Sequence, residues 1–448
     1  MPLGHNGVVA APPAFRARSE RAPLGTEYDN MLACIRCGLC LTSCPTYVLS
    51  MHESEGPRGR VGIARALTEG HLEVSPDLVE HELNCLVCDA CSAVCPAGVH
   101  MDPLQVALRT AIEPDVRRPW WQRLVRQAVF GWLFMDMARF RLVARALWLY
   151  QRSGLRWLAR QLGVLNVLGL SGAERLLPDL PARFVVPRGE TYPYAVSASR
   201  RPQHAAFFAG CVMSTALAEV DRATIRLLQR AGFAVANPAR QGCCGALHAH
   251  SGDARFRALA RANIAVFEGS EGPIVVNSAG CGAMLKDYAH HFRDDPDWAA
   301  RAHAFSARVR DVSEVLAAHE LPLPTPVEAR VVYQDACHLL HAQRISRQPR
   351  DLLRRVRGVE LHEIAEPGLC CGSAGVYNLT NPEQSRQLQQ RKLEHALEQS
   401  PDVIVTANPG CLLQLQAGLA ERGSQVRVRH LVELLDEAST PPSGDGRW

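Results

Sequence analysis

Two copies of one cysteine motif lie near the N-terminus of the sequence. Each copy has the spacing C-x2-C-x2-C-x3-C-P, and all four cysteines shift by the same 51 residues from one copy to the next. The positions are Cys34, Cys37, Cys40 and Cys44 in the first copy, and Cys85, Cys88, Cys91 and Cys95 in the second. This spacing is typical of chains that hold cubane clusters through thiolates. It therefore predicts two [4Fe–4S] clusters.

The order of the cysteines also predicts which of them share a cluster. In two-cluster ferredoxins the fourth cysteine of each motif ligates the cluster of the other motif. The expected ligand sets are Cys34, Cys37, Cys40 and Cys95 for one cluster, and Cys85, Cys88, Cys91 and Cys44 for the other. Structural zinc is the alternative, but zinc ribbons use paired C-x2-C knuckles and need no third cysteine in the same loop.

The other eight cysteines form a second, looser repeat. They are Cys211, Cys243, Cys244 and Cys281 in the first copy, and Cys337, Cys370, Cys371 and Cys411 in the second. Gly245 and Gly372 follow the adjacent pairs and complete two CCG blocks. Adjacent cysteines do not easily form a disulfide with each other, because that bond needs a specific geometry. The repeat favours a metal centre over buried structural thiols, which are the alternative.

Short apolar strands and longer helical patterns surround this second repeat. The expected strands include Ala205–Phe208, Ile274–Val276, Val331–Tyr333 and Val403–Thr406, and the expected helices include Ala254–Phe267 and Glu383–Leu397. A strand, then a cysteine, then a helix is the order found in α/β sheets. It places the cysteines at the carboxyl ends of strands, where open α/β sheets bind ligands.

These patterns divide the chain into six segments and predict an α+β fold. The segments are a disordered leader (1–24), a helical two-cluster ferredoxin-type domain (25–114), a helical connector (115–199), two halves of a pseudo-twofold α/β CCG domain (200–322 and 323–437) and a disordered tail (438–448). The leader is rich in Ala, Pro and Arg and has no apolar core of a signal peptide. Sixteen cysteines without such a signal predict metal binding in a reducing cytoplasm.

The bulk composition excludes two classes of partner. The net charge of +4 is too small to indicate nucleic-acid binding. The longest apolar run, Gln127 to Met135, is far shorter than the roughly 18 residues of a membrane-spanning helix. The chain is therefore expected in the cytoplasm, with a peripheral place on the inner face of the membrane as the second option.

The connector has an unusual pairing of residue types. Residues 117–160 contain ten Arg and a single acid, Asp136, and five of the seven Trp of the chain. Arg and Trp on one set of helices suit a membrane interface or a protein-docking face. The alternative is a connecting bundle in which the Trp side chains form the core.

Taken together, these motifs resemble a known family. Two CCG blocks behind a two-cluster ferredoxin module are similar to heterodisulfide-reductase-like proteins, and to the iron–sulfur subunits of lactate, glycerol-3-phosphate and glycolate dehydrogenases. The resemblance is strongest to the glycolate oxidase iron–sulfur subunits and covers about residues 28–437. Its segments are Cys34–Tyr47, Gly56–Arg60, Gly242–Ala246, Ser278–Ala283, Cys370–Gly375 and Val405–Cys411.

The resemblance implies a function shared with partner subunits. It implies an electron-transfer subunit of a glycolate dehydrogenase complex, with no catalytic residue of its own, beside FAD-binding subunits that convert glycolate to glyoxylate. Electrons would pass on towards membrane quinone. The sequence agrees, because no G-x-G-x-x-G follows a strand and hydride abstraction from a hydroxy acid needs a flavin or nicotinamide.

One departure from the relatives leaves alternatives open. Heterodisulfide reductases end each block with C-x-x-C, whereas Met284 and Gln414 stand at the last position here. The second repeat can therefore hold one further Fe–S cluster or a site for a partner or quinone. The alternative functions are the equivalent subunit of a lactate or glycerol-3-phosphate dehydrogenase, or a heterodisulfide-reductase-like catalytic subunit.

Histidines stand beside three of these cysteines. His248 and His250 follow the first CCG block, and His338 and His341 follow Cys337. Imidazole near a redox centre relays protons or donates a hydrogen bond to a thiolate. Surface or helix-capping histidines are the alternative interpretation.

Overall fold

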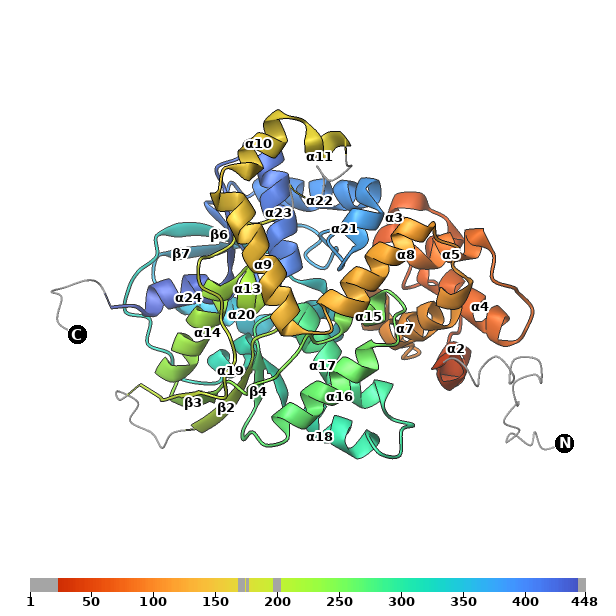
Figure 1. The fold of residues 1–448 in the computed structure, drawn as a ribbon, viewed down its shortest axis with the longest axis horizontal. Coiled ribbons are helices and arrows are strands. Elements are labelled where there is room, and N and C mark those ends of the chain that lie inside the picture. The colour runs from red at the N-terminus through yellow and green to blue at the C-terminus, as the bar shows by residue number, and fades with distance from the viewer. Residues whose placement is uncertain (1–22, 168–173, 175–176, 196–202, 442–448) are drawn as a thin grey trace. The chain divides into compact units, whose positions relative to one another are not determined.

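A computed structural model describes residues 23–167, 174, 177–195 and 203–441 of the chain (Figure 1). Most of the predicted disordered leader and tail lies outside these residues. The chain divides into two compact units. The first unit runs up to Arg118 and includes the later segment Ala249–Ala254, and the second holds Pro119–His248 and the chain from Arg255 onward.

The regular structure described in the first unit is entirely helical. Its elements are η1 (Pro23–Glu27), α2 (Tyr28–Leu32), α3 (Pro45–Ser50), η2 (Glu53–Glu55), α4 (Pro57–Thr68), α5 (Pro76–Leu83), α6 (Ala90–Val94), α7 (Met101–Ile112) and η3 (Glu113–Asp115). Proline occupies the first position of α3, α4 and α5, where the missing amide hydrogen costs no hydrogen bond. The helical ferredoxin-type region predicted from the sequence is confirmed.

The core of this unit lies along one face of α7. Met101, Leu104, Leu108 and Ile112 are buried at the three- and four-residue spacing of an amphipathic helix. They pack with apolar residues of α2, α4 and α5, and the side chains of Cys34, Cys91 and Cys95 lie against the same cluster. The cysteine loops are therefore held by the core of the unit.

The predicted helical connector is helical in its first part and includes the strand Thr191–Tyr192 near its end. Its elements are α8 (Trp120–Arg126), the π-helix η4 (Gln127–Leu133), α9 (Met137–Arg152), α10 (Leu155–Gln161) and α11 (Val164–Val167). Asp136 caps α9 by accepting hydrogen bonds from the amides of Ala138 and Arg139. Trp120, Trp121, Trp132 and Trp157 are exposed, so the alternative in which the connector tryptophans form a core is wrong for four of the five.

Two sheets form the rest of the second unit. The first has the strand order β1-β3-β2-β4-β5 and the second has the order β7-β6-β8-β9. All pairs are parallel except β1 with β3. The strands are β1 (Thr191–Tyr192), β2 (Gln203–Phe208), β3 (Phe233–Ala236), β4 (Ile274–Val276), β5 (Val309–Asp311), β6 (Ala329–Tyr333), β7 (Val359–His362), β8 (Val403–Thr406) and β9 (Arg427–His430).

The helices of this unit follow the strands. They are α13 (Val212–Thr215), α14 (Ala218–Arg230), α15 (Ala246–His250), α16 (Phe256–Phe267), α17 (Ala279–His291), α18 (Ala299–Arg308), α19 (Val312–Ala317), the π-helix η5 (His338–Ala342), α20 (Arg347–Arg355), α21 (Tyr377–Thr380), α22 (Pro382–Leu397), α23 (Pro409–Glu421) and α24 (Leu431–Ser439). The helix α24 ends two residues inside the predicted tail. Of the helices in the described residues, none is long and apolar enough to cross a membrane.

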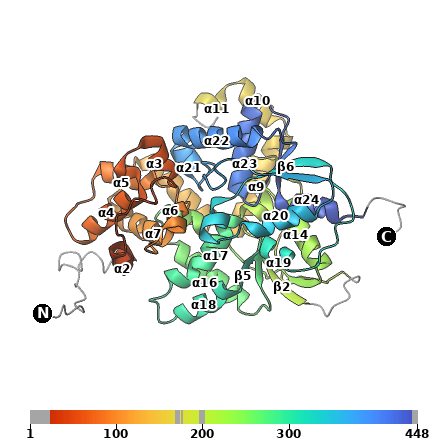
Figure 2. The ribbon, with the colours of Figure 1, turned by 180° about the vertical axis from the view of Figure 1, so that it is seen from behind.

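The two sheets repeat one topology and pack around a shared core. The order β3-β2-β4-β5 in one half matches β7-β6-β8-β9 in the other. The helix α14 packs on α24, and α19 packs on α20. In the repeat α14 corresponds to α20 and α19 to α24, so a twofold axis that exchanges the halves turns one contact into the other. These helices lie together between β2 and β6 (Figure 2). The pseudo-twofold α/β arrangement predicted from the repeat is confirmed.

Candidate metal centres

A cavity in the first unit brings Cys44 to the cysteines of the second motif. Its lining includes Cys44, Cys85, Cys88, Cys91 and the guanidinium-bearing Arg60. The cavity has an empty volume of about 370 Å³, open solvent included. Cys44 stands at the start of α3, whereas the other three thiols lie in the loop after α5 and in α6. We call these four cysteines the Cys44 set.

The remaining N-terminal cysteines gather around the first motif. Burial raises the pKa of the Cys40 thiol, and the negative charges of Cys34 and Cys95 add to the rise. Cys95 is therefore one of the thiols whose charge acts on Cys40, although it belongs to the other motif in sequence. Cys37 occupies the same loop, and its side chain is exposed. We call Cys34, Cys37, Cys40 and Cys95 the Cys95 set.

The two motif loops share a backbone conformation that wraps the chain around each set. Arg36 and Gly38 in the first loop, and Val87 and Asp89 in the second, all have positive φ, between 49° and 83°. These positions are equivalent under the 51-residue repeat. A β-branched residue such as Val87 rarely adopts a left-handed conformation. The loop holds it there, and its amide nitrogen lies 3.4 Å from the Cys85 sulfur as a hydrogen-bond donor.

The first CCG half brings its four thiols into one row. The Cys211 sulfur lies 3.7 Å from that of Cys243, and the Cys244 sulfur lies 3.3 Å from that of Cys281. Cys211 follows β2, the CCG loop follows β3, and Cys281 lies in the first turn of α17 after β4. Each cysteine therefore follows the carboxyl end of a parallel strand, as predicted.

The second CCG half repeats this row with Cys337, Cys370, Cys371 and Cys411. Each thiol acts on the pKa of its neighbour, Cys370 on that of Cys337, Cys371 on that of Cys370, and Cys411 on that of Cys371. The loop is tight at Gly372, which has a φ of +86°. A Cβ atom there would lie 2.4 Å from the carbonyl oxygen of Ser385. Glycine is therefore required at this position of the CCG block.

The electrostatics of the thiols suit a bound cation. In the first half, the hydrogen bond between Cys211 and Cys243 raises the pKa of Cys211 and lowers that of Cys243. In the second half, the interaction with Cys337 lowers the pKa of Cys370. The interaction of Cys370 with Cys371, together with burial, outweighs that effect and raises the pKa of Cys370 to about 12.

Burial also raises the pKa of Cys91 well above its ordinary value, and the charges of Cys85 and Asp89 add to the rise. Four neighbouring thiols cannot all ionise in such surroundings unless positive charge enters the site. Thiolates select soft metals and Fe–S clusters. The donor sets therefore fit thiolate-ligated metal centres.

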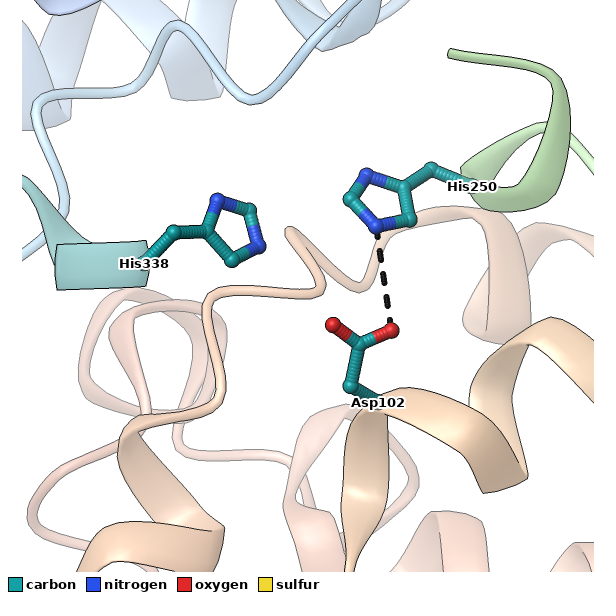
Figure 3. Close-up of side chains that lie close together, drawn as sticks. All are labelled: Asp102, His250 and His338. Carbon is teal, nitrogen blue, oxygen red and sulfur yellow. Dashed lines mark ion pairs between the residues drawn. The ribbon is translucent and has the colours of Figure 1, made fainter. Parts of the chain in front are cut away.

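The histidines beside the cysteines have partners that fix their places. His250 lies 3.7 Å from a carboxylate oxygen of Asp102 within the first unit (Figure 3). His248 is buried, with its Nε2 atom 2.9 Å from the carbonyl oxygen of Phe130. His341 has its Nε2 atom 2.8 Å from the carbonyl oxygen of Gly368. These contacts favour structural roles for His248 and His341, and the proton-relay hypothesis stays a prediction.

Four buried charged residues near the Cys44 set were not singled out from the sequence as site residues. They are Glu55, Arg60, Glu82 and Arg109, each less than one-tenth exposed. Only Arg60 carried a signal, as the last residue of the Gly56–Arg60 segment. Gly59 in that segment is required, because a Cβ atom there would lie 2.0 Å from the carbonyl oxygen of Glu53.

Comparison with protein families places these sites in a known class. A 4Fe-4S dicluster domain matches residues 33–99, and the cysteine-rich CCG domain matches twice, at residues 205–286 and 331–416. Between them, residues 121–177 match the linker region of glycolate oxidase iron-sulfur subunits. The chain is therefore an iron–sulfur electron-transfer protein with two [4Fe–4S] clusters and a doubled CCG domain.

Individual relatives extend this match over nearly the whole chain. The probable glycolate oxidase iron-sulfur subunit of Bacillus subtilis (strain 168) is 39% identical over 92% of this chain and 95% of its own length. The glycolate oxidase iron-sulfur subunit of Escherichia coli (strain K12) is 33% identical over the same shares. Lactate utilization protein A of Oceanobacillus iheyensis is 31% identical over 51% of this chain and 95% of its own. The chain belongs to the family of glycolate oxidase iron–sulfur subunits and is an oxidoreductase subunit.

Proposed function

We propose that the chain is the electron-transfer subunit of a glycolate dehydrogenase complex that oxidises glycolate to glyoxylate. Its partners are FAD-binding dehydrogenase subunits in a hetero-oligomer, and its electrons go towards membrane quinone. The chain itself contributes no catalytic residue to glycolate oxidation. The family membership supports this assignment, because both near-full-length relatives are named as glycolate oxidase subunits.

The observation that carries the proposal is the exchange of cysteines between the two N-terminal motifs. Cys44 lines the cavity of Cys85, Cys88 and Cys91, and the charge of Cys95 acts on the Cys40 thiol. Two-cluster ferredoxins exchange their fourth ligand in the same way. We therefore assign the Cys44 set to one cluster and the Cys95 set to the other. Such clusters supply one-electron transfer when they are bound.

The eight cysteines of the CCG domain form a second pair of four-thiol sites. The two rows are Cys211, Cys243, Cys244 and Cys281, and Cys337, Cys370, Cys371 and Cys411. We assign them to a further Fe–S cluster, with a partner or quinone site as the alternative. The convergence of each row and its position after the parallel strands support a metal.

A partner must perform the hydride chemistry. Glycolate becomes glyoxylate when it loses two electrons and two protons, and a flavin is a cofactor that accepts them together. The sequence contains no G-x-G-x-x-G after a strand, and its cysteines fit metal rather than a dinucleotide. Electrons therefore reach this chain from a flavin in another subunit, one at a time.

The connector supports a place at the cytoplasmic face of the membrane. Trp120 and Trp157 are 73% and 65% exposed, and Leu142 and Leu162 are 66% and 67% exposed. Interfacial helices combine such apolar side chains with basic residues, and ten Arg lie on the same stretch. We propose that this connector, residues 115–199, docks the subunit peripherally and brings its electrons within reach of quinone.

One variant tests the division of labour between subunits. Replacing Cys88 by Ser removes a thiolate that an iron centre prefers. In the assembled complex, Cys88→Ser should lower electron delivery to a quinone analogue by at least about tenfold. Glycolate should still bleach the flavin absorbance, because hydride transfer occurs in the partner. The exposed Leu72→Ser should change neither measurement.

Two outcomes would reject the proposal. Loss of flavin reduction by glycolate in a correctly assembled Cys88→Ser complex would place this chain in the hydride step. Robust glycolate oxidation by the isolated chain would instead favour a catalytic centre in the CCG domain. If lactate or glycerol 3-phosphate reduces the flavin and glycolate does not, the substrate assigned to the complex would change, and the electron-transfer role of this chain would stand.

A further inference from the structure

Two arginine side chains are buried beside the Cys44 set. The side chain of Arg60, on α4, is 1% exposed. Its Nη1 atom lies 3.9 Å from the Cys44 sulfur and donates a hydrogen bond of 3.1 Å to Thr46 Oγ1. The same group donates to the backbone carbonyls of Glu55 and His81. A guanidinium stays charged in proteins, so a fixed positive charge sits beside this ligand set.

Arg109, on α7, approaches the same set from the Cys85 loop. Its Nη2 atom donates hydrogen bonds to the carbonyl oxygens of Glu82 at 2.8 Å and Cys85 at 2.6 Å. Its Nη1 atom donates to the carbonyl oxygen of His250. Arg109 is 7% exposed and forms no salt bridge with a carboxylate among the described residues. The hydrogen bonds of Arg109 therefore go to backbone carbonyl groups.

The nearby carboxylates do not cancel both arginines. Glu55 lies 2.9 Å from Arg60, and it shares its other oxygen with His81 at 2.7 Å and Asn84 at 3.2 Å. Glu82 is fully buried, and one of its oxygens accepts a hydrogen bond from Gln105. Of these carboxylates only Glu55 forms an ion pair with either arginine. Asp89 and Asp102 also line this cavity, but Asp89 accepts a hydrogen bond from Ser92, and Asp102 lies 3.7 Å from His250. Arg109 is instead held by the carbonyl oxygens of Glu82 and Cys85.

In the described part of the chain, the Cys95 set has no matching buried guanidinium. Arg58 is the guanidinium that lies over its loop, because a Cβ atom on Gly38 would lie 2.9 Å from the Arg58 Nη1 atom. Arg58 is paired through two nitrogens with Glu53, at 2.5 Å and 3.0 Å, and both side chains reach solvent. Water and the paired carboxylate screen such a charge. The two sets thus have the same ligands and different electrostatic surroundings.

We infer that Arg60 and Arg109 give the cluster of the Cys44 set a higher reduction potential than the cluster of the Cys95 set. Reduction adds one negative charge to a cluster, and a buried positive charge nearby stabilises that reduced form. An electron that reaches either cluster therefore rests on the Cys44 set. The two arginines act as positioning residues for the electron rather than as ligands. This inference rests on the ligand sets assigned under the proposed function.

A redox titration of the whole chain, followed by electron paramagnetic resonance, tests the inference. The wild-type protein, purified anaerobically, should show two distinct potentials. Arg109→Gln removes the charge and should lower only the higher potential, by at least tenfold in the equilibrium constant for reduction, about 59 mV for one electron. Arg109→Lys keeps the charge and should restore most of the loss.

A second variant, with the opposite expected shift in reduction potential, distinguishes an electrostatic effect from a folding defect. Asp89 lines the same cavity and has a φ of 61°, a conformation that Asn tolerates well. Asp89→Asn removes a negative charge and should raise the same potential that Arg109→Gln lowers. Arg65→Gln is the matched control, because the Arg65 side chain on α4 is 40% exposed and paired with Glu69. It should move neither potential.

The outcomes separate this inference from the proposed function. Iron and sulfide well below about eight atoms each per chain, or stoichiometric zinc, would reject the ligand sets themselves. Full iron content with an Arg109→Gln variant that leaves the higher potential in place would reject the inference alone. Equal shifts of both potentials in Asp89→Asn or Arg109→Gln would also reject it, because the charges are argued to act on one set.

Discussion

At the scale of single residues, the sites differ in what surrounds the thiols rather than in the thiols. Every set offers four sulfur atoms, yet among the described residues only the Cys44 set has guanidinium groups buried beside it. Burial lowers the pKa of Arg109, while nearby negative charges oppose that shift. For Arg60 the balance is reversed, since burial lowers its pKa but Cys85, Glu82 and Cys44 raise it by more. The cations and the thiols therefore stabilise each other's charged forms.

Cys44 provides the sharpest residue-level prediction about the exchanged ligands. Cys44→Ser should abolish the same spectroscopic cluster signal as Cys88→Ser, although Cys44 belongs to the first motif in sequence. Cys95→Ser should abolish the other signal, together with Cys37→Ser. The measurement is electron paramagnetic resonance of each reduced variant, with iron content falling by about four atoms where one cubane is lost.

Uncrossed ligation would give the opposite pairing. Cys44→Ser would then remove the same signal as Cys37→Ser, and Cys95→Ser the same signal as Cys88→Ser. Neither signal has to be assigned to a particular cluster, because the test compares only which of the four variants lose the same signal. Loss of both signals in the Cys37→Ser variant alone would show unfolding and not ligation, and the other three variants would still group.

The spacing of the cysteines predicts which of them meet, because metal ligands converge in a fixed local geometry. The buried charges were not predictable in the same way. Glu55 and Arg109 are separated by more than fifty residues and meet the site only through packing of η2, α4 and α7. Periodicity assigns such residues to exposed positions by default, since charged side chains are rarely buried unless paired.

At the scale of elements, two capped helices show how closely the CCG halves correspond. Asp311 ends β5 and caps α19, and His430 ends β9 and caps α24. In both helices, the glutamate three residues after the cap accepts a hydrogen bond from the backbone nitrogen of the capping residue. The distance is 2.8 Å for Glu314 and 2.7 Å for Glu433. The caps occupy equivalent places in the repeat but have different chemistry.

The histidine cap predicts acid sensitivity of the second half. Burial lowers the pKa of His430 to about 4, against the opposing effect of the carbonyls of Asn277 and Ala407. The unfolded chain binds a proton near pH 6.5, so between pH 6.5 and 4 it binds more protons than the folded chain. Stability is full above pH 6.5 and falls as the pH falls towards 4. From pH 7 to pH 5 the loss should be about 2 kcal/mol.

His430→Asn tests this link. Asparagine keeps an acceptor at the cap and does not titrate in this range. Chemical denaturation at pH 7 and pH 5 should therefore show a smaller loss of stability in the variant than in the unaltered chain. His303→Asn, at an exposed position on α18, should keep the original loss. An unchanged pH effect in His430→Asn would show that another group causes the acid sensitivity.

Element prediction worked best where the hydrophobic pattern was continuous. The predicted strands Ile274–Val276 and Val403–Thr406 match β4 and β8, and both are wholly buried. The edge strand β1 was not predicted and lies within the expected helical connector. It has two residues, Thr191 and Tyr192, and forms through antiparallel pairing with β3. A strand so short has no periodicity of its own, so only its partner reveals it.

At the scale of the whole molecule, the connector separates two cysteine-rich regions in sequence and exposes apolar side chains. Monomeric proteins rarely expose large apolar side chains together, and such surfaces mark partner or membrane contacts. Trp132 stacks under Arg139, with 5.4 Å from the guanidinium carbon to the ring centroid, and Trp148 lies 5.9 Å from that of Arg145. Arginine and tryptophan are thus paired along α9 and η4.

This surface predicts binding to anionic lipid. Basic residues are attracted to acidic headgroups, and tryptophan favours the interface between headgroups and acyl chains. The full chain should sediment with vesicles that contain an anionic phospholipid and should bind zwitterionic vesicles less. The double variant Trp120→Ser and Trp121→Ser should weaken that binding by at least about tenfold, as the loss of about 1.4 kcal/mol of apolar burial would give.

Salt and a matched substitution distinguish a lipid surface from a protein partner. Raised ionic strength should weaken vesicle binding, since screening reduces the attraction between arginine and lipid charges. Leu379→Ser removes an exposed apolar side chain from the second CCG half and should leave binding unchanged. If the chain ignores anionic vesicles, and the tryptophan variant instead fails to assemble with its flavin-bearing partners, then the connector is a subunit interface. Electrons would in that case reach quinone through another part of the complex.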